Sequence, residues 1–163
     1  MRIWFVCKAK YQKEDDEGHL KNTTETYLLD AVSYTEAEAI MYEKLSERVR
    51  GEFVITSLTK SRITDVFLYE DADFWHKCKI TYFVTDADSG KEKKVTNLMI
   101  VTAHDVKDAY DRIHQSLNNM LVTFRVPEVV ETSIVEVFAY GQDNEEEEEV
   151  PAGFKPLSEV EED

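Results

Sequence analysis

The sequence holds little of what most recognisable catalytic and structural motifs need. Its 163 residues include only two cysteines, three prolines and five glycines. So few glycines leave no phosphate-binding glycine loop and no dinucleotide-binding fingerprint, and no Gly-x-Ser-x-Gly motif occurs either. Two cysteines exclude a disulfide framework. Because Cys7 and Cys78 both fall within apolar, strand-like patterns, we expect buried, reduced thiols, and we expect no cofactor.

Long apolar runs are also missing. No stretch approaches the roughly 20 consecutive apolar residues that a membrane-spanning helix needs. Residues 1–8 lack the long apolar core and the small-residue cleavage site of a signal peptide. The sequence therefore predicts a cytoplasmic protein that has no membrane partner.

Basic residues are scarce relative to acidic ones, 19 against 34, which gives a formal net charge of −15. Much of the excess lies beyond Gln142, where ten acidic residues face Lys155 alone, a net charge of −9. Like charges at this density repel one another, so we expect residues 142–163 to form a flexible acidic tail. Within it, Phe154 and Leu157 are either anchors that recruit a partner protein into a basic, apolar groove, or incidental hydrophobic residues of a solubilising segment.

What the sequence does contain is a duplication. An offset of 71 residues relates two sets of positions: Trp4, Cys7, Lys8, Tyr11, Phe53, Ile63, Val66, Phe67 and Tyr69 recur as Trp75, Cys78, Lys79, Tyr82, Phe124, Ile134, Val137, Phe138 and Tyr140. Self-similarity at a fixed spacing is typical of a duplicated structural unit. The sequence therefore predicts a single domain over residues 1–141, made of repeats 1–70 and 71–141.

Each repeat has the same predicted elements. Alternating apolar and polar residues predict a first strand, a polar turn with glycine and a returning strand, at Thr24–Val32 in one copy and Thr96–Thr102 in the other. Helical spacing of apolar residues follows at Thr35–Val49 and at Asp105–Leu117, and two short β-rich runs close each repeat. The predicted fold class is α+β, with two pseudo-symmetric strand-strand-helix-strand-strand halves, an antiparallel sheet and two helices.

Four stretches of the chain resemble a known family: Trp4–Lys8, Ala31–Ala39, Gly51–Phe53 and Trp75–Lys79. They are similar to a family of proteins of this length from Bacteroidetes bacteria and their phages and mobile elements, which is designated only as a domain of unknown function. The resemblance covers roughly residues 1–141. It implies a small intracellular accessory protein of a phage or mobile element, and it assigns no functional residue.

Residue types that carry chemistry are scattered along the chain. None of the four histidines forms a His-x-x-x-His or Glu-x-x-His pair, so the sequence has no zinc signature. In a chain with 34 acidic residues, pairs such as Asp15-Asp16, and Asp71 with Asp73, are expected by chance, and we interpret them as solvated turns. We therefore expect no catalytic, metal-binding or cofactor-binding residues and no enzymatic activity.

One predicted surface combines aromatic and basic residues. They share the outward face of the first strand in each repeat: Trp4, Lys8, Lys10, Trp75, Lys77 and Lys79. Tryptophans interleaved with lysines can stack on bases and follow a phosphate backbone. The alternative is a face on which lysines protect an edge strand while the tryptophans pack inward. The net charge of −15 favours this second interpretation.

Two functions fit these observations. The first is a non-enzymatic interaction protein, accessory to a phage or mobile element, whose sheet forms a platform for a partner protein. The second is a nucleic-acid-related module, either a weak single-strand binder using Trp4 and Trp75 or an acidic mimic of DNA. A contiguous lysine and tryptophan patch would favour the single-strand binder, whereas a deep pocket with a histidine beside buried carboxylates would favour an enzyme.

Overall fold

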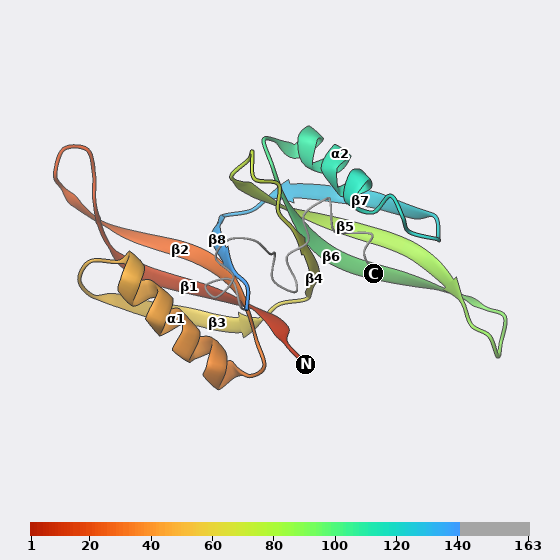
Figure 1. Ribbon diagram of the computed structural model, residues 1–163, viewed down its shortest axis with the longest axis horizontal. Helices are drawn as coiled ribbons and strands as arrows, with labels where there is room; N and C mark the ends of the chain where they lie inside the picture. The colour runs from red at the N-terminus through yellow and green to blue at the C-terminus, as the bar shows by residue number, and fades with distance from the viewer. Residues whose placement is uncertain (141–163) are drawn as a thin grey trace. The chain divides into compact units, whose positions relative to one another are not determined.

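The computed structural model describes residues 1–140, which form an α+β fold with two helices and two mostly antiparallel four-stranded sheets (Figure 1). The elements follow in the order β1 (Ile3–Glu14), β2 (Leu20–Ala31), α1 (Tyr34–Arg48), β3 (Phe53–Lys60), β4 (Ile63–Phe67), β5 (Phe74–Thr85), β6 (Glu92–Ala103), α2 (Val106–Ser116), β7 (Phe124–Glu131) and β8 (Ile134–Phe138). Neither helix within this range is long and apolar enough to cross a membrane. Both halves of the chain follow the predicted order of elements.

The first sheet has the strand order β3-β1-β2-β8 and carries α1 on one face. Its core consists of fully buried side chains from β1, β2 and α1, among them Phe5, Cys7, Leu29, Met41 and Leu45. The helix begins where the side chain of Ser33 accepts a hydrogen bond from the Glu36 backbone N–H at 3.1 Å, and the Glu36 carboxylate accepts one from the Val32 backbone N–H at 2.8 Å. Ser33 is therefore the N-cap, and its side chain and that of Glu36 together form a capping box.

The second sheet has the strand order β4-β6-β5-β7 and carries α2. Its core is built from Cys78, Ile80, Met99, Val101, Ala103, Ala109, Ile113 and Leu117. Two apolar residues of this helix are exposed, Val106 at 45 % and Tyr110 at 43 %. The apolar residues of this segment that belong to the core are Ala109, Ile113 and Leu117, which are spaced four residues apart, and Ser116 is buried beside them.

The last strand of each repeat joins the sheet of the other repeat. Strand β4 pairs in parallel with β6, and β8 pairs in parallel with β2. The compact units are consequently Met1–Ser61 with the segment that begins at Ser133, and Arg62–Thr132. They do not coincide with the predicted repeats 1–70 and 71–141. The expectation of antiparallel pairing throughout is wrong for these two strands, because hydrophobic alternation reveals a strand but not its partner.

Pairing registers in the two sheets correspond residue by residue. Strands β1 and β5 are 12 residues long, β3 and β7 are 8, and β4 and β8 are 5. An irregularity interrupts the β1–β3 pairing after Lys8 and the β5–β7 pairing after Lys79, 71 positions later. Pro127 lies at this second irregularity on the edge strand β7, where the lack of a backbone N–H is tolerated.

Candidate functional site

A groove with a volume of about 710 Å³ lies in the first unit, where β3 begins beside the hairpin of β1 and β2. Its lining consists of Lys10, Tyr11, Gln12, Leu20, Asn22 and residues 50–54. We call this feature the Lys10–Arg50 groove. Gly51 makes the turn from α1 into β3 with a φ of 99°, a conformation that favours glycine.

The Lys10–Arg50 groove combines positive charge with apolar surface. Leu20 and Val54 are exposed at 62 % and 60 %. Lys10 and Arg50 are exposed as well, and within residues 1–140 neither forms an ion pair, whereas Arg2, Arg48 and Arg112 each lie within 4 Å of a carboxylate. The groove is therefore locally basic on a chain whose net charge is −15.

The groove also borders an open strand edge. Strand β1 pairs with β3 from Phe5 to Tyr11, but its pairing with β2 continues to Glu14. Among the described strands, none lies beside Gln12–Glu14 on the β3 side. The outward N–H and C=O groups of this stretch can pair with an added extended segment.

The second unit differs at the corresponding positions. Its pair Tyr82 and Phe124 matches Tyr11 and Phe53 in register. Thr81 pairs with Arg125 where Lys10 pairs with Val54, and Lys94 stands across from Phe83 where Asn22 stands across from Gln12. The two hairpins therefore share their backbone pairing but distribute their basic side chains differently.

The predicted face of tryptophan and lysine is not available for base stacking. Trp4 is 7 % exposed and Trp75 is 5 % exposed, so both rings are buried. Lys8 and Lys10 are exposed, and Lys77 and Lys79 are half-buried, with Lys79 Nζ 3.7 Å from a Glu128 carboxylate oxygen. The face opposite the helix is buried around each tryptophan, which strand alternation by itself cannot indicate. Of the six residues, only Lys10 lines the groove.

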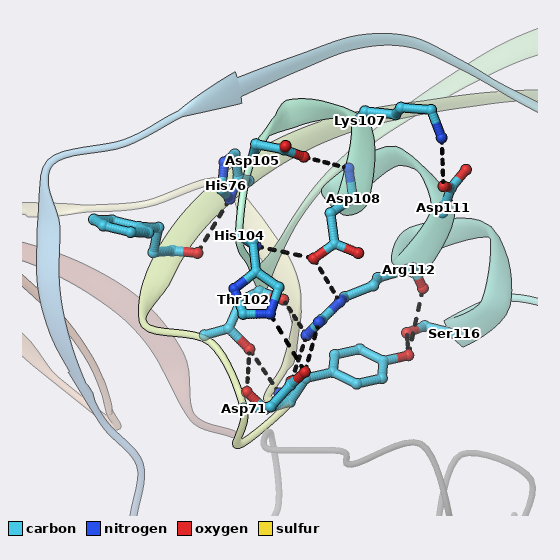
Figure 2. Close-up of polar contacts among 12 residues, drawn as sticks. Asp71, His76, Thr102, His104, Asp105, Lys107, Asp108, Asp111, Arg112 and Ser116 are labelled. Carbon is cyan, nitrogen blue, oxygen red and sulfur yellow. Dashed lines mark hydrogen bonds and ion pairs between the residues drawn. The ribbon is translucent and has the colours of Figure 1, made fainter.

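A cluster of charged residues lies in the second unit at the end of β4 (Figure 2). Arg112 reaches from α2 between two carboxylates: its guanidinium donates to both oxygens of Asp71 at 2.9 Å and lies 3.0 Å from Asp108 Oδ2. It also donates to the Thr102 carbonyl at 3.3 Å and lies 4.9 Å from the centre of the Tyr69 ring. The Arg112 hydrogen bond lowers the pKa of Asp71. The cluster therefore pairs its charges with one another.

Four further contacts complete this cluster. The His104 backbone N–H donates to Asp108 at 2.9 Å and lowers the pKa of that carboxyl, while His104 Nε2 lies 3.5 Å from Asp71 Oδ2. The Tyr69 hydroxyl lies 2.7 Å from Ser116 Oγ, and the Tyr69 backbone N–H donates to Thr102 Oγ1 at 2.6 Å. These contacts hold the chain just after β4, so we infer that the cluster anchors the end of that strand.

A corresponding cluster anchors the end of β8 in the first unit. The Tyr140 backbone N–H donates to Asp30 Oδ1 at 2.7 Å. Arg2 donates to the Asp30 carbonyl at 2.9 Å, lies 3.2 Å from a Glu36 carboxylate oxygen and covers the Tyr140 ring at 3.9 Å. Burial raises the pKa of Asp30, and the Tyr140 N–H and Arg2 act against that shift.

The other residue types considered for chemistry are dispersed. Within residues 1–140, no group of three or more histidine, cysteine, aspartate or glutamate side chains could hold a metal ion. Cys7 and Cys78 are free and buried, as predicted, and burial raises the pKa of their thiols to about 11 and about 12. Asp15 accepts hydrogen bonds from the backbone of Glu17 and His19, which makes it a turn residue.

The comparison with protein families gives one match, which covers residues 3–140 and carries the description "Domain of unknown function (DUF4494)". The chain belongs to this family. Neither the search of curated proteins nor the search of solved structures found a match. The DUF4494 match spans both repeats and includes the Lys10–Arg50 groove and both arginine clusters.

The proposed tail anchors Phe154 and Leu157 lie outside the DUF4494 match and outside the described residues. Sequence reasoning missed Arg50, Leu20 and Val54 as groove residues, because each is an ordinary surface residue until the pairing of β1 with β3 is known. It also missed Arg2 and Arg112. The recurrence of Tyr69 as Tyr140 was the one available signal, since the two tyrosines lie two residues beyond the ends of β4 and β8.

Proposed function

We propose that this protein is a non-enzymatic binding module whose Lys10–Arg50 groove holds an extended, acidic and apolar segment of a partner protein. The observation that carries this proposal is the coincidence, in one groove, of two cations that form no ion pair within residues 1–140, exposed apolar side chains, and a strand edge beside which no described strand lies. The open edge supplies backbone pairing, and the side chains supply selectivity for acidic and apolar residues.

A polypeptide fits the Lys10–Arg50 groove better than a nucleic acid does. Base stacking needs accessible aromatic rings, and both tryptophans are buried. A phosphate backbone needs a continuous basic track, whereas the groove has two cations, Lys10 and Arg50, and also contains Glu52. An extended peptide needs only a short basic region beside an open edge.

Further parts of the proposal concern the origin and setting of the protein. We infer that its two halves are pseudo-symmetric products of duplication, because strand lengths and pairing registers correspond between them. The role of an accessory protein in the cytoplasm, carried by a phage or mobile element, rests on the resemblance described above.

Selection of random peptides on the full-length chain tests the proposal. We expect enrichment of sequences that combine Asp or Glu with Phe or Leu, and binding of those peptides at least about tenfold weaker to a Lys10→Glu/Arg50→Glu variant. A Lys93→Glu/Lys94→Glu variant is the matched control, because it makes the same charge change on the hairpin of the second unit. Equal binding to all three proteins, or tighter binding of single-stranded oligonucleotides in the same assay, would overturn the proposal.

A further inference from the structure

We infer that, in the absence of a partner, the Lys10–Arg50 groove is occupied by the acidic tail of the same chain, residues 145–157. This inference rests on the proposed function and adds its regulation. The tail acts as an intramolecular latch that a partner segment has to displace. Three features of the chain support it: tail length, charge and side-chain composition.

The length of the tail matches the distance to the groove. Tyr140 is fixed to Asp30 at one end of β2 by a 2.7 Å hydrogen bond, and Asn22 lines the groove eight residues away along the same strand. Eight residues of β-strand span about 27 Å. Residues 145–149 follow Tyr140 by five to nine positions, so an extended chain carries them at most about 17 to 31 Å. Glu148 and Glu149, eight and nine positions beyond Tyr140, can therefore reach the groove, and Phe154 and Leu157 follow them.

Charge and composition are complementary as well. Residues beyond Gln142 carry a net charge of −9, and the groove offers two cations without an ion-pair partner among residues 1–140. Phe154 and Leu157 follow the glutamates and supply apolar side chains for the exposed surfaces of Leu20 and Val54. The charge attraction acts over about 10 Å at 0.1 M salt, so it is strongest once the segment lies in the groove.

A tethered segment competes effectively even when its intrinsic affinity is weak. A segment joined to its binding site by a short connection has an effective concentration on the order of 1 mM at that site. A partner peptide with the same groove contacts therefore binds the native chain more weakly than a chain whose tail cannot dock. The arrangement makes the protein selective for partners that bind more tightly than its own tail.

Paramagnetic relaxation in the full-length protein tests the latch. A spin label attached at Ser158→Cys reports on amides near the docked tail, and labelling is selective because burial holds the pKa of the Cys7 and Cys78 thiols at about 11 and about 12. We expect broadening of the amides of Tyr11, Gln12 and Phe53. This broadening should be lost in the Lys10→Glu/Arg50→Glu variant and retained in the Lys93→Glu/Lys94→Glu control variant.

The outcomes separate the latch from the proposed function. No broadening at the groove, equal broadening in the charge-reversed variant, or broadening only between a labelled and an unlabelled molecule would overturn the intramolecular latch. A synthetic peptide of residues 143–160 is then added to a full-length variant with Glu145–Glu149 changed to glutamine. Binding about tenfold tighter than to the native chain supports the latch. If the peptide binds both proteins equally, the latch fails and the groove remains a peptide site, whereas no binding to either overturns both.

Discussion

At the residue scale, two arginines that the repeat does not relate make equivalent contacts in the two units. Arg2 comes from the start of the chain and Arg112 from the middle of α2, yet each donates to a backbone carbonyl at the end of a long strand. Each also pairs with an acidic residue in the first turn of a helix and covers a tyrosine ring. A guanidinium suits this task because its planar set of donors can serve several acceptors at once.

Replacing Arg112 by methionine tests this role. We expect a lower urea midpoint at pH 7, because Asp71 and Asp108 lose their partner. Both carboxyls have a lowered pKa in the folded protein, so their contribution is complete above the unfolded value near 3.8 and is lost as pH falls through the folded values. The difference between wild type and variant should therefore narrow from pH 7 to pH 3.

Lys107→Met is the control for that measurement. Lys107 forms an exposed pair with Asp111 in the same helix, at 3.3 Å, and such pairs contribute little to stability. Two results would show that the cluster does not anchor β4. One is a urea midpoint for Arg112→Met equal to that of Lys107→Met, and the other is a difference in midpoint between wild type and Arg112→Met that widens as the pH falls.

His76 offers a second test at the residue scale. It is fully buried, and within the described residues its Nε2 has no hydrogen-bond partner, while Nδ1 lies 3.1 Å from the Phe74 carbonyl. Phe5 occupies the corresponding register position in the first sheet and is also fully buried. We expect His76→Phe to raise the free energy of unfolding by about 1 kcal/mol, because it removes an unsatisfied polar atom.

The reverse change at the corresponding position of the first sheet is Phe5→His. It should lower the free energy of unfolding by about 2 to 4 kcal/mol, because apolar burial is lost and a ring nitrogen is buried without a partner. Urea unfolding of both variants gives these values. Destabilisation by His76→Phe would instead indicate that the Nε2 atom has a partner in solution.

At the element scale, the main feature is the exchange of β4 and β8. Their sequences, Ile-Thr-Asp-Val-Phe and Ile-Val-Glu-Val-Phe, are nearly the same, and each pairs in parallel with the second strand of the other repeat. The buried side chains of the pair, Val66 and Val137, are 0 % and 3 % exposed. Because the strands are so similar, their apolar pattern does not indicate which of them pairs with β2.

Hydrogen exchange can locate the partner of each exchanged strand. Phe67 is 3 % exposed, so Phe67→Ala should cost about 3 to 5 kcal/mol and should reduce amide protection first in β6. Phe138→Ala, in which the ring stacked on Tyr27 is lost, should reduce protection first in β2. The opposite pattern, with Phe67→Ala acting on β2, would show that each repeat keeps its own last strand.

The sequence predicts features that depend on the residue pattern within one element, and it does not predict features that depend on which strands pair. Both helices and the burial of Cys7 and Cys78 follow from spacing within one element. The parallel partners of β4 and β8 do not, because a short apolar strand satisfies either sheet equally well. The groove was missed for the same reason: Lys10 and Arg50 are forty residues apart, and only the pairing of β1 with β3 brings them together.

At the scale of the whole molecule, each compact unit depends on chain from both repeats. The first unit needs β8 from the second repeat, and the second unit needs β4 from the first. Folding of either sheet therefore requires contacts between residues far apart in sequence, such as Leu28 with Val137. Long-range pairing of this kind slows folding relative to local hairpins, and it makes the completion of the two sheets interdependent.

Cutting the chain between the repeats tests this interdependence. We expect fragments 1–70 and 71–163, produced by cleavage at a short protease site inserted after Glu70, to elute together in size-exclusion chromatography at pH 7. Each fragment supplies the fourth strand of the other's sheet, and the apolar side chains of Val66, Phe67 and Val137 return to water if they separate. The same cut in a Phe67→Ala/Phe138→Ala protein should release the fragments, because both exchanged strands lose an apolar side chain. Fragments that separate without these substitutions would show that the exchanged strands do not hold the two halves together.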